Sequence, residues 1–270
     1  MTQTRFPRSF DSDNSSIHAS LYDYSSVAIA LDDLTFAYPH HPKILDGIDL
    51  HIGTSERVGV IGPNGAGKTT LFMLLSGIFK PTQGMVKVFN APVIPGQFRS
   101  DIGLVFQNPD DQLFAASVRD DVAFGPENMG LPQDEVDVRV REALKLTGMS
   151  DHAERPPHHL SGGEKRMVAI AGVMAMLPRL IIYDEPSANL DMRARRRLIQ
   201  FLQHSHETML ISSHDLEFIL EVCDRVILLD AGAIVADGKP SHIMGDENLM
   251  LAHGLEKPHS LIPHAEPHHG

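Results

Sequence analysis

Hydrophobic and polar positions along the chain predict an α/β core that begins near Val27. Residues 27–38 alternate between apolar and polar side chains in the manner of a half-buried strand. Three later segments, RVGVIG, RLIIYDEP and TMLISSHD, are short apolar runs that lead into loops. Runs of this kind are typical of strands that are covered on both faces of a parallel sheet. We therefore expect a parallel sheet with helices on its faces.

A second pattern predicts a helical lobe inserted into this core. Residues from about 108 to 166 carry little strand signal and include DEVDVRVREALKLTG, in which apolar positions recur at helical spacing. The two ends of the chain have a different composition. Residues 1–26 are expected to form a disordered polar arm, and the Pro- and His-rich residues 254–270 a tail that passes from order to disorder. The folded domain is therefore expected over residues 27–253.

Composition limits the classes of protein to which the chain can belong. With 270 residues and 42% apolar side chains it can bury a substantial core, and a net charge of −12 argues against a nucleic-acid partner. The longest apolar stretch, 167–177, is shorter than the roughly 20 residues that cross a bilayer. The start of the chain fits neither a secretory signal nor a transit peptide. Cys223 has no second cysteine to pair with, which suits a reducing compartment, and its apolar surroundings predict helix core rather than a reactive thiol.

A glycine-rich segment, GPNGAGKTT at residues 62–70, predicts a phosphate-binding loop. It follows a buried strand and precedes a helix, which is the context that the P-loop pattern requires. Its backbone N–H groups can turn toward a polyphosphate, which the positive end of the helix also attracts. Lys68 would reach the β- and γ-phosphates, and the Thr69 hydroxyl would bind Mg²⁺. The alternative is a plain glycine-rich turn that leads into a helix.

Two acids and a histidine are expected at the same edge of the sheet. Asp184 and Glu185 follow an apolar strand, and because neighbouring strand residues point to opposite sides, we expect them to have different roles. Asp184 suits the Mg²⁺ shell, and Glu185 suits a general base for the attacking water. His214 ends another strand at this edge, although a lone histidine there is often structural. Two acids in a solvated loop are the alternative.

A second glycine-bearing turn, LSGGEKR, begins at Leu160. Its Ser161 can cap a helix by accepting a hydrogen bond from free backbone N–H groups. The turn also has the glycines and the helix N-terminus that are typical of a phosphate-binding site. Since residues 62–70 already predict one such site, the question is which phosphate a second one would bind. The two interpretations are compatible with each other.

Together with these segments, Tyr38 in FAYP, Gln107 in VFQNPDDQLF and Asp191 in SANLD complete a set of motifs. In order and spacing the set resembles the ATPase subunits of ATP-binding cassette (ABC) transporters, over about residues 27–257. The resemblance implies a P-loop NTPase (RecA-like) core with a parallel sheet, an antiparallel β subdomain and an inserted α-helical subdomain.

The resemblance also implies roles for named residues. Tyr38 would stack on adenine, and Gln107 would reach Mg²⁺ and the attacking water. The residues expected to act in catalysis are Lys68, Gln107, Glu185 and His214, and those expected to bind Mg²⁺ are Thr69, Gln107 and Asp184. The residues expected to contact ATP are Tyr38, Gly62, Pro63, Asn64, Gly65, Ala66, Gly67, Lys68, Thr69, Thr70, Ser161, Gly162, Gly163, Glu164 and Asp191.

The family's arrangement answers the question that LSGGE raises. Two subunits would meet head to tail, so that Ser161 and Gly163 hold the γ-phosphate of the nucleotide on the other chain, with Asp191 at the seam. The expected partner is a second copy of this chain, because a two-fold pair presents one patch to its own copy. A related chain in place of the second copy remains open.

The stretch FQNPDDQLFAASVRDDVAFGPENMGLP is similar to the ATPases of energy-coupling-factor importers. The resemblance implies integral membrane subunits docked in a groove that the acids and Phe114 line, with Asp110, Asp111 and Gln112 on its polar edge. It also implies a peripheral place on the cytoplasmic face of the inner membrane. An acidic solvated loop is the alternative. In AIAGVMAMLP and AHGLEKPHSLIPH the chain is most like the cobalt and nickel branch. Vitamin or other solute importers, a soluble non-transport ABC protein and a regulator without turnover stay open.

Three further features bear on this interpretation. The chain has 16 histidines, and those of the C-terminal part would suit metal handling although their spacing defines no fixed site. They are His253, His259, His264, His268 and His269. Met192 stands where many relatives have proline. The arginines between 193 and 197 are expected to form a solvated helix face.

Overall fold

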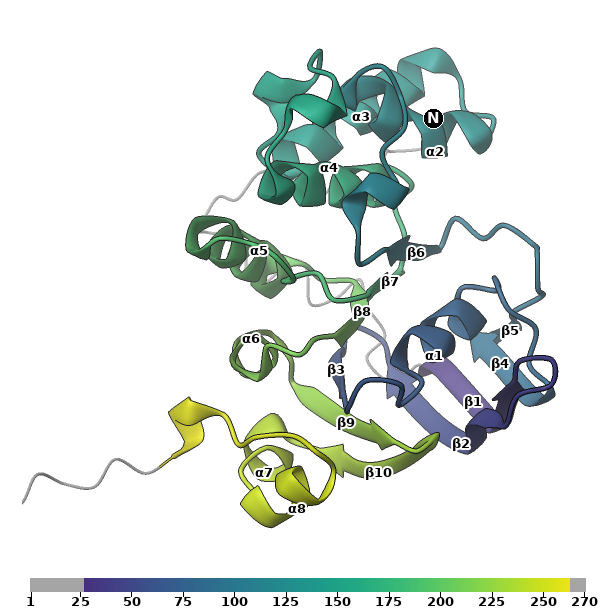
Figure 1. The fold of residues 1–270 in the computed structure, drawn as a ribbon. Coiled ribbons are helices and arrows are strands. Elements are labelled where there is room, and N and C mark those ends of the chain that lie inside the picture. The colour runs from purple at the N-terminus through teal and green to yellow at the C-terminus, as the bar shows by residue number, and fades with distance from the viewer. Residues whose placement is uncertain (1–26, 263–270) are drawn as a thin grey trace, which may run out of the picture.

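The computed structural model of the protein describes residues 27–262, and within them the chain forms two sheets and a separate helical lobe (Figure 1). The expected arm, 1–26, and the end of the tail, 263–270, lie outside the described residues. The smaller sheet has four strands in the order β2-β1-β4-β5, and its neighbouring strands are antiparallel. These strands are β1 (Val27–Ala37), β2 (Lys43–Gly53), β4 (Gln83–Val88) and β5 (Ala91–Pro92). The first strand begins where the alternation predicts.

The larger sheet has six strands in the order β10-β9-β3-β8-β7-β6. They are β3 (Arg57–Ile61), β6 (Ile102–Val105), β7 (Leu180–Tyr183), β8 (Thr208–Ser212), β9 (Arg225–Asp230) and β10 (Ala233–Gly238). All neighbouring pairs are parallel except β9 with β10. Every residue of β7 and β8 is buried, as the apolar runs predict. Because β3, β8 and β7 are adjacent, the loops that follow them meet at one edge.

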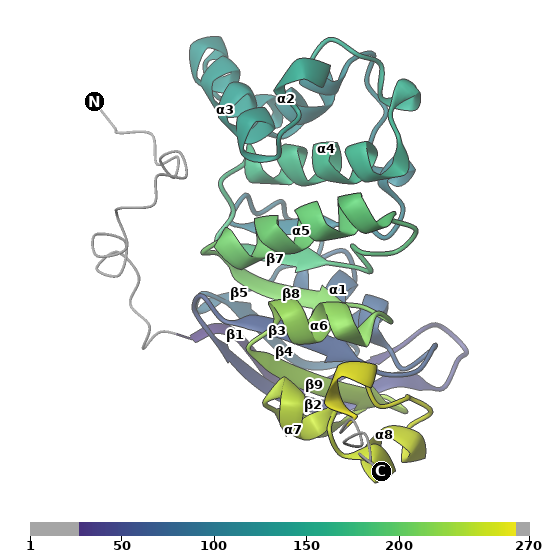
Figure 2. The same ribbon diagram turned by 90° about the vertical axis from the view of Figure 1, so that its left-hand side faces the viewer.

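Helices cover the larger sheet and build the lobe. Around the sheet lie α1 (Lys68–Leu75), α5 (Met192–His204), α6 (Leu216–Val222), α7 (Pro240–Ile243) and α8 (Glu247–Ala252). The lobe contains α2 (Val118–Asn128), α3 (Gln133–Leu146) and α4 (Gly162–Met174), with the 3₁₀ turns η2 (Pro109–Asp111), η3 (Ser150–His152) and η4 (Pro157–His159). A last 3₁₀ turn, η5, covers His259–Leu261. In both ribbon views the lobe lies at the end of the molecule opposite α7 and α8 (Figures 1 and 2). Residues 108–166 therefore contain most of the lobe, but α4 continues to Met174.

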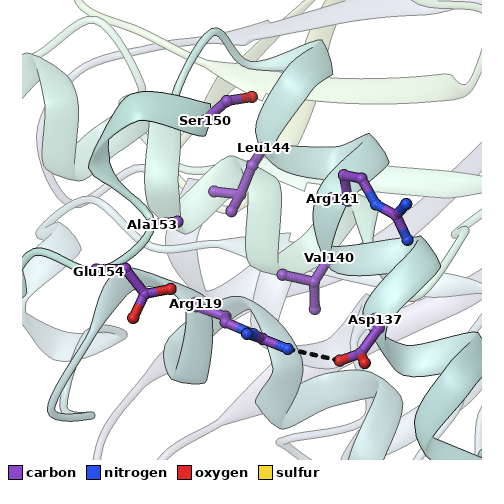
Figure 3. A pocket seen from close by; sticks show the side chains of 8 residues that line it. All are labelled: Arg119, Asp137, Val140, Arg141, Leu144, Ser150, Ala153 and Glu154. Atoms are coloured by element: carbon purple, nitrogen blue, oxygen red, sulfur yellow. Dashed lines mark hydrogen bonds and ion pairs between the residues drawn. The ribbon is translucent and has the colours of Figure 1, made fainter.

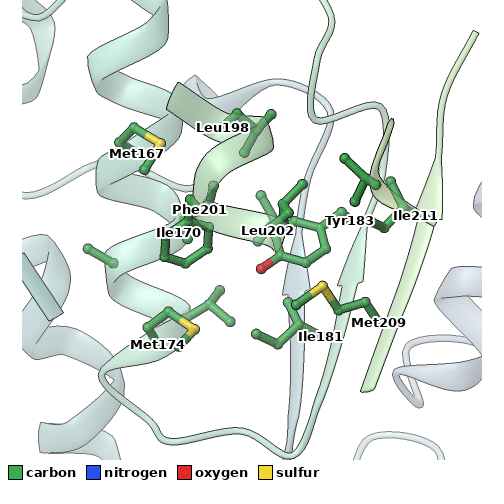
Figure 4. Close-up of a cluster of buried hydrophobic side chains, with 14 of the residues drawn as sticks. Met167, Ile170, Met174, Ile181, Tyr183, Leu198, Phe201, Leu202, Met209 and Ile211 are labelled. Atoms are coloured by element: carbon green, nitrogen blue, oxygen red, sulfur yellow. The ribbon is translucent and has the colours of Figure 1, made fainter. Parts of the chain in front are cut away.

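One hydrophobic cluster joins the lobe to the sheet (Figure 4). Helix α5 lies between α4 and the sheet, with its apolar stripe buried and its arginines outside. The side chains that meet there come from α4 (Met167, Ile170, Met174), β7 (Ile181, Tyr183), α5 (Leu198, Phe201, Leu202) and β8 (Met209, Ile211). Packing of this kind fixes the direction of α4 relative to the sheet edge.

Two smaller expectations can be checked here. Cys223 is buried but lies immediately after α6 rather than within it, and burial raises the pKa of its thiol well above the usual value. Among residues 27–262, no helix combines the length and the apolar character that a passage through a bilayer needs.

Candidate nucleotide-binding site

The glycine-rich loop lies between β3 and α1, as the sequence predicts. Gly62 has a φ of 150°, and a Cβ atom there would lie 1.9 Å from the carbonyl oxygen of Leu229, so only glycine fits. Gly67 caps α1 with a φ of 106°. The Nζ atom of Lys68 donates to the carbonyl oxygens of Gly62 at 2.7 Å and of Pro63 at 3.0 Å. The lysine is thus folded back over its own loop.

The ammonium group of Lys68 is largely buried. The residue is 8% exposed, and burial lowers the pKa of its ammonium, while the carboxylates of Glu185 and Asp184 act in the opposite direction. A lysine in these surroundings is poorly solvated. A polyphosphate oxygen could replace the loop carbonyls as its partner at low cost.

The Asp184 carboxylate connects the loop to the sheet. Its Oδ2 atom accepts a hydrogen bond from the Thr69 hydroxyl at 2.8 Å, and its Oδ1 atom accepts one from the Ser212 hydroxyl at 2.7 Å. Asp184 is 4% exposed, whereas Thr69 is exposed. A carboxylate beside a hydroxyl is an oxygen donor set of the type that Mg²⁺ prefers, so these two side chains fit the expected ion.

Glu185 has partners different from those of Asp184, but not for the reason that strand alternation suggested. Strand β7 ends at Tyr183, and Glu185 has a left-handed backbone with a φ of 48°. Its N–H donates to the Ser212 hydroxyl at 3.0 Å, so one buried serine holds both acids. A non-glycine residue in this conformation is strained, and the surrounding bonds keep it there.

The Glu185 carboxylate lies against His214. Its Oε2 atom accepts a hydrogen bond from the His214 backbone N–H at 3.0 Å. The distance from Oε1 to the ring atom Nε2 of His214 is 3.5 Å, and this buried oxygen has no hydrogen-bond partner. The structure therefore brings Lys68, Thr69, Asp184, Glu185 and His214 to one edge of the sheet, with one carboxylate oxygen free to accept a proton.

Tyr38 lies just after β1, which ends at Ala37. It is 38% exposed, and its ring meets Phe36 edge-on at 5.0 Å and Phe79 edge-on at 5.7 Å. Phe36 and Phe79 are themselves stacked at 5.4 Å. The cluster supports an aromatic side chain whose exposed part could contact a flat ring.

Gln107 lies in the loop between β6 and η2 and is exposed. Of the side chains expected on the polar edge of this loop, Asp110 and Asp111 are exposed. Gln112 instead bonds to the backbone of the β6 end, with Oε1 accepting from the Phe106 N–H at 2.8 Å and Nε2 donating to the Leu104 carbonyl at 3.2 Å. Gln112 thus holds the loop in shape.

The LSGGE segment forms the N-terminus of α4 and lies in the lobe, away from α1 in both ribbon views (Figures 1 and 2). Ser161 caps the helix: its Oγ accepts from the Glu164 N–H at 3.3 Å, and Glu164 Oε2 accepts from the Ser161 N–H at 2.8 Å. The Ser161 hydroxyl also donates to Glu164 Oε2 at 2.7 Å, and this bond, together with the one from the Ser161 N–H, lowers the pKa of Glu164. Gly163 is close to α5, because a Cβ atom there would lie 2.6 Å from that of Ala194. Gly162 is exposed with open space beside it.

Asp191 caps α5, where its Oδ1 accepts from the Ala194 N–H at 2.8 Å. The arginines that follow are not all solvated as expected. Arg195 bonds to Asp215 at 2.6 Å and to Glu221 at 3.0 Å, and Arg196 bonds to Glu221 at 2.9 Å. This end of α5 is therefore fastened to α6, directly beyond His214.

The C-terminal histidines do not form a site within the described part of the chain. The Nδ1 atom of His253 lies 2.7 Å from Oδ2 of Asp230, and residues 27–262 hold no group of three metal-ligating side chains. His264, His268 and His269 fall outside the described residues.

A separate hollow of about 330 Å³ lies in the lobe between α2 and α3, where Arg119 pairs with Asp137 at 2.7 Å (Figure 3). None of the residues that line it is among those expected to bind ATP or Mg²⁺.

The sequence did not identify two side chains that support this region, Ser212 and Arg166. Ser212 is a small polar residue in an apolar strand, and Arg166 is a charged residue in an apolar helix; both are buried. The only signal was their position on an otherwise apolar face.

A glycine-rich loop with a buried lysine, joined through Thr69 to a carboxylate at the sheet edge, defines a P-loop ATPase. The family described as ABC transporter matches residues 45–188. The chain belongs to this family as one of its ATP-binding proteins, and it hydrolyses ATP in a transporter.

Relatives and solved structures agree with this assignment. The chain is 53% identical over 234 residues to an ABC transporter ATP-binding protein of Synechocystis, covering 87% of this chain and 82% of that protein. It is 48% identical over 238 residues to the energy-coupling factor transporter ATP-binding protein EcfA of Methanothermobacter thermautotrophicus, covering 85% and 76%. The structure is similar to cbiO1 of Clostridium perfringens, part of the ABC transporter complex cbiONQ, with a TM-score of 0.75, 36% identity and coverage of 84% and 94%.

Proposed function

We propose that this chain is the ATP-hydrolysing motor subunit of an energy-coupling-factor importer that takes up cobalt or nickel ions. The observation that carries the proposal is the surface at η2, where exposed acids lie beside exposed aromatic rings next to the Gln107 loop. Phe114 is 67% exposed and Phe124 50% exposed, and their rings meet edge-on at 4.9 Å. The likeness to EcfA and to cbiO1 of the cbiONQ complex supports the same class.

In this proposal the sheet edge performs the hydrolysis. Lys68 binds the β- and γ-phosphates, and Tyr38 contacts the adenine. Thr69 and Asp184 hold Mg²⁺, which neutralises phosphate charge when it is bound, and Gln107 is a further ligand. The glycine-rich loop orients the triphosphate through its backbone N–H groups.

Glu185 accepts the proton of the attacking water. Its Oε1 atom is buried and lacks a hydrogen-bond partner, and its Oε2 atom is fixed by the His214 N–H. A base that is held by one oxygen and free at the other can orient a water molecule without losing its own position. The Nε2 atom of His214 lies 3.5 Å from Oε1 of Glu185. His214 therefore lies where it contacts the γ-phosphate of the bound nucleotide.

A second copy of the chain completes each site. Ser161 and Gly162 are exposed at the N-terminus of α4, which lies apart from the chain's own P-loop. A helix N-terminus with exposed glycine attracts an anion, and in a two-fold pair it would face the γ-phosphate bound by the other subunit. Gly163, Glu164 and Asp191 lie at the same seam. ATP then stabilises the closed pair by its differential affinity, and hydrolysis reopens it.

Membrane subunits dock at the η2 surface on the cytoplasmic face of the inner membrane. Asp111 supplies negative charge there, while Asp110 is paired with Lys165 of α4 at 2.6 Å, and Phe114 supplies an apolar contact. A short basic helix of the membrane partner would complement both. No nucleic acid is expected at a chain with a net charge of −12.

The experiment that tests the function is uptake by the purified transporter. The chain is isolated from membranes together with its partners and reconstituted in vesicles, and cobalt, nickel and vitamin uptake are compared with and without ATP. The proposal expects ATP-dependent uptake of cobalt or nickel, and no uptake with the Glu185→Gln variant. ATP-dependent uptake of a vitamin alone would show that the substrate is a vitamin and not a metal ion. Isolation of the chain without any membrane protein would favour a soluble ABC protein.

A further inference from the structure

Helix α4 carries a buried arginine whose partners lie in the Gln107 loop. Arg166 is 2% exposed, and its two terminal nitrogens donate to the backbone carbonyls of Phe106 and Gln107. Its Nε atom is buried without a hydrogen-bond partner. Burial lowers the pKa of Arg166 to about 10, and the field of Asp184 acts against this shift. A charge in such a place is costly unless its hydrogen bonds are made, so its position calls for an explanation.

The guanidinium fixes two successive peptide groups. A planar fork that binds neighbouring carbonyls sets the orientation of both, which a flexible lysine cannot do. The N–H of Phe106 is held from another side by Gln112 Oε1 at 2.8 Å. The backbone before and at Gln107 is therefore fastened to α4, while the residue itself is exposed. The direction in which the Gln107 side chain leaves the loop is determined by these bonds.

The same helix begins at the other predicted phosphate contact. Ser161 caps α4 five residues before Arg166, which corresponds to about 7.5 Å along a helix axis. Helix α4 packs closely against α5 at its N-terminal end, where Gly163 lies next to Ala194. A movement of its N-terminus therefore displaces Arg166, and with it the loop of Gln107.

We propose that Arg166 is a positioning residue that fixes Gln107 against α4 and so couples the nucleotide site of this subunit to the site that α4 completes on its partner. The inference rests on the proposed roles of Gln107 and of the α4 N-terminus. In this role Arg166 does more than stabilise the fold. When the nucleotide on the partner subunit binds the N-terminus of α4 and shifts it, Gln107 moves toward the nucleotide bound by its own subunit.

A double-mutant cycle tests the proposal. The full-length variants Arg166→Met, Gln107→Ala and their combination are compared in ATP hydrolysis at varied Mg²⁺ and ATP. The methionine variant is expected to lose roughly 10- to 100-fold in kcat, the scale of a misplaced catalytic group. It should also need more Mg²⁺ for half-maximal rate and lose cooperativity in ATP, while nucleotide binding to the subunit is retained. In the Gln107→Ala background the second substitution should add nothing, because Arg166 acts through Gln107.

The matched control is Arg139→Met. Arg139 is another largely buried arginine of the lobe, but it bonds to Glu135 of its own helix at 2.6 Å. Its kcat and Mg²⁺ dependence should be unchanged. If Arg166→Met does not fold, Arg166→Lys replaces it; a lysine can satisfy one carbonyl only, so an intermediate kcat with the same change in Mg²⁺ dependence is expected.

Two results would overturn the inference while leaving the proposed function intact. One is a folded Arg166→Met or Arg166→Lys variant with wild-type kcat, Mg²⁺ dependence and cooperativity. The other is an additive loss in the double variant. Failure of the wild-type chain to show cooperative hydrolysis would instead count against the shared site itself, so the two failures are distinguishable.

Discussion

Removal of the Ser212 hydroxyl is expected to destabilise the protein and its site together. This hydroxyl is fully buried, donates to Asp184 Oδ1 at 2.7 Å and accepts from the Glu185 N–H at 3.0 Å. In Ser212→Ala both buried groups lose their partner. An unsatisfied buried donor costs about 1–3 kcal/mol and a carboxylate oxygen at least as much, so the free energy of unfolding should fall by about 3–4 kcal/mol.

Thermal unfolding measures this loss, and a fall in Tm of roughly 10 °C corresponds to it for a chain of this size. The Mg²⁺ concentration for half-maximal hydrolysis should rise as well, because Asp184 is no longer oriented. Ser205→Ala is the matched control: its hydroxyl donates to the Phe201 carbonyl at 2.9 Å at the end of α5, and its loss should cost about 1 kcal/mol or less. Equal Tm values for the two variants would refute the argument.

Three further predictions follow from the site and its surroundings. Glu185→Gln should retain ATP binding and lose roughly 10² to 10⁴-fold in hydrolysis rate, and near-normal turnover would remove Glu185 from the role of base. The Cys223 thiol, whose pKa is raised by burial, should resist alkylation at pH 8 in the folded protein and react after unfolding. Rapid labelling of the folded chain would show that α6 opens. The double variant Asp111→Lys and Phe114→Ser should keep the ATPase rate of the isolated chain and lose co-purification with the membrane partner, and intact co-purification would move the docking surface elsewhere.

The parts of the site that depend on local sequence could be predicted. The glycine-rich loop, the buried strands β3, β7 and β8 and the cap at Ser161 each lie within a short segment whose pattern is sufficient. Because parallel strands deliver their ends to one edge, the meeting of Lys68, Asp184 and His214 also followed from the sequence.

The parts that depend on distant pairs could not be predicted. The Ser212 hydroxyl reaches a residue 28 positions away, and Arg166 reaches one 60 positions away, so neither bond leaves a local pattern. The left-handed backbone of Glu185 is imposed by its surroundings, since a glutamate has no preference for it. The pairing of Arg195 with Asp215 likewise joins two helices that the sequence treats separately.

The central proposition is that each ATP is held between two copies of the chain, and a mixing experiment tests it most directly. Lys68→Ala and Ser161→Arg are each placed in a Glu185→Gln background, which should retain bound ATP. Alone, each variant lacks one half of both sites and should stay monomeric with ATP. Mixed, they should form dimers with one ATP, because the intact P-loop of one chain meets the intact Ser161 turn of the other. A mixture that stays monomeric in ATP, under conditions in which the Glu185→Gln parent dimerises, would contradict the account.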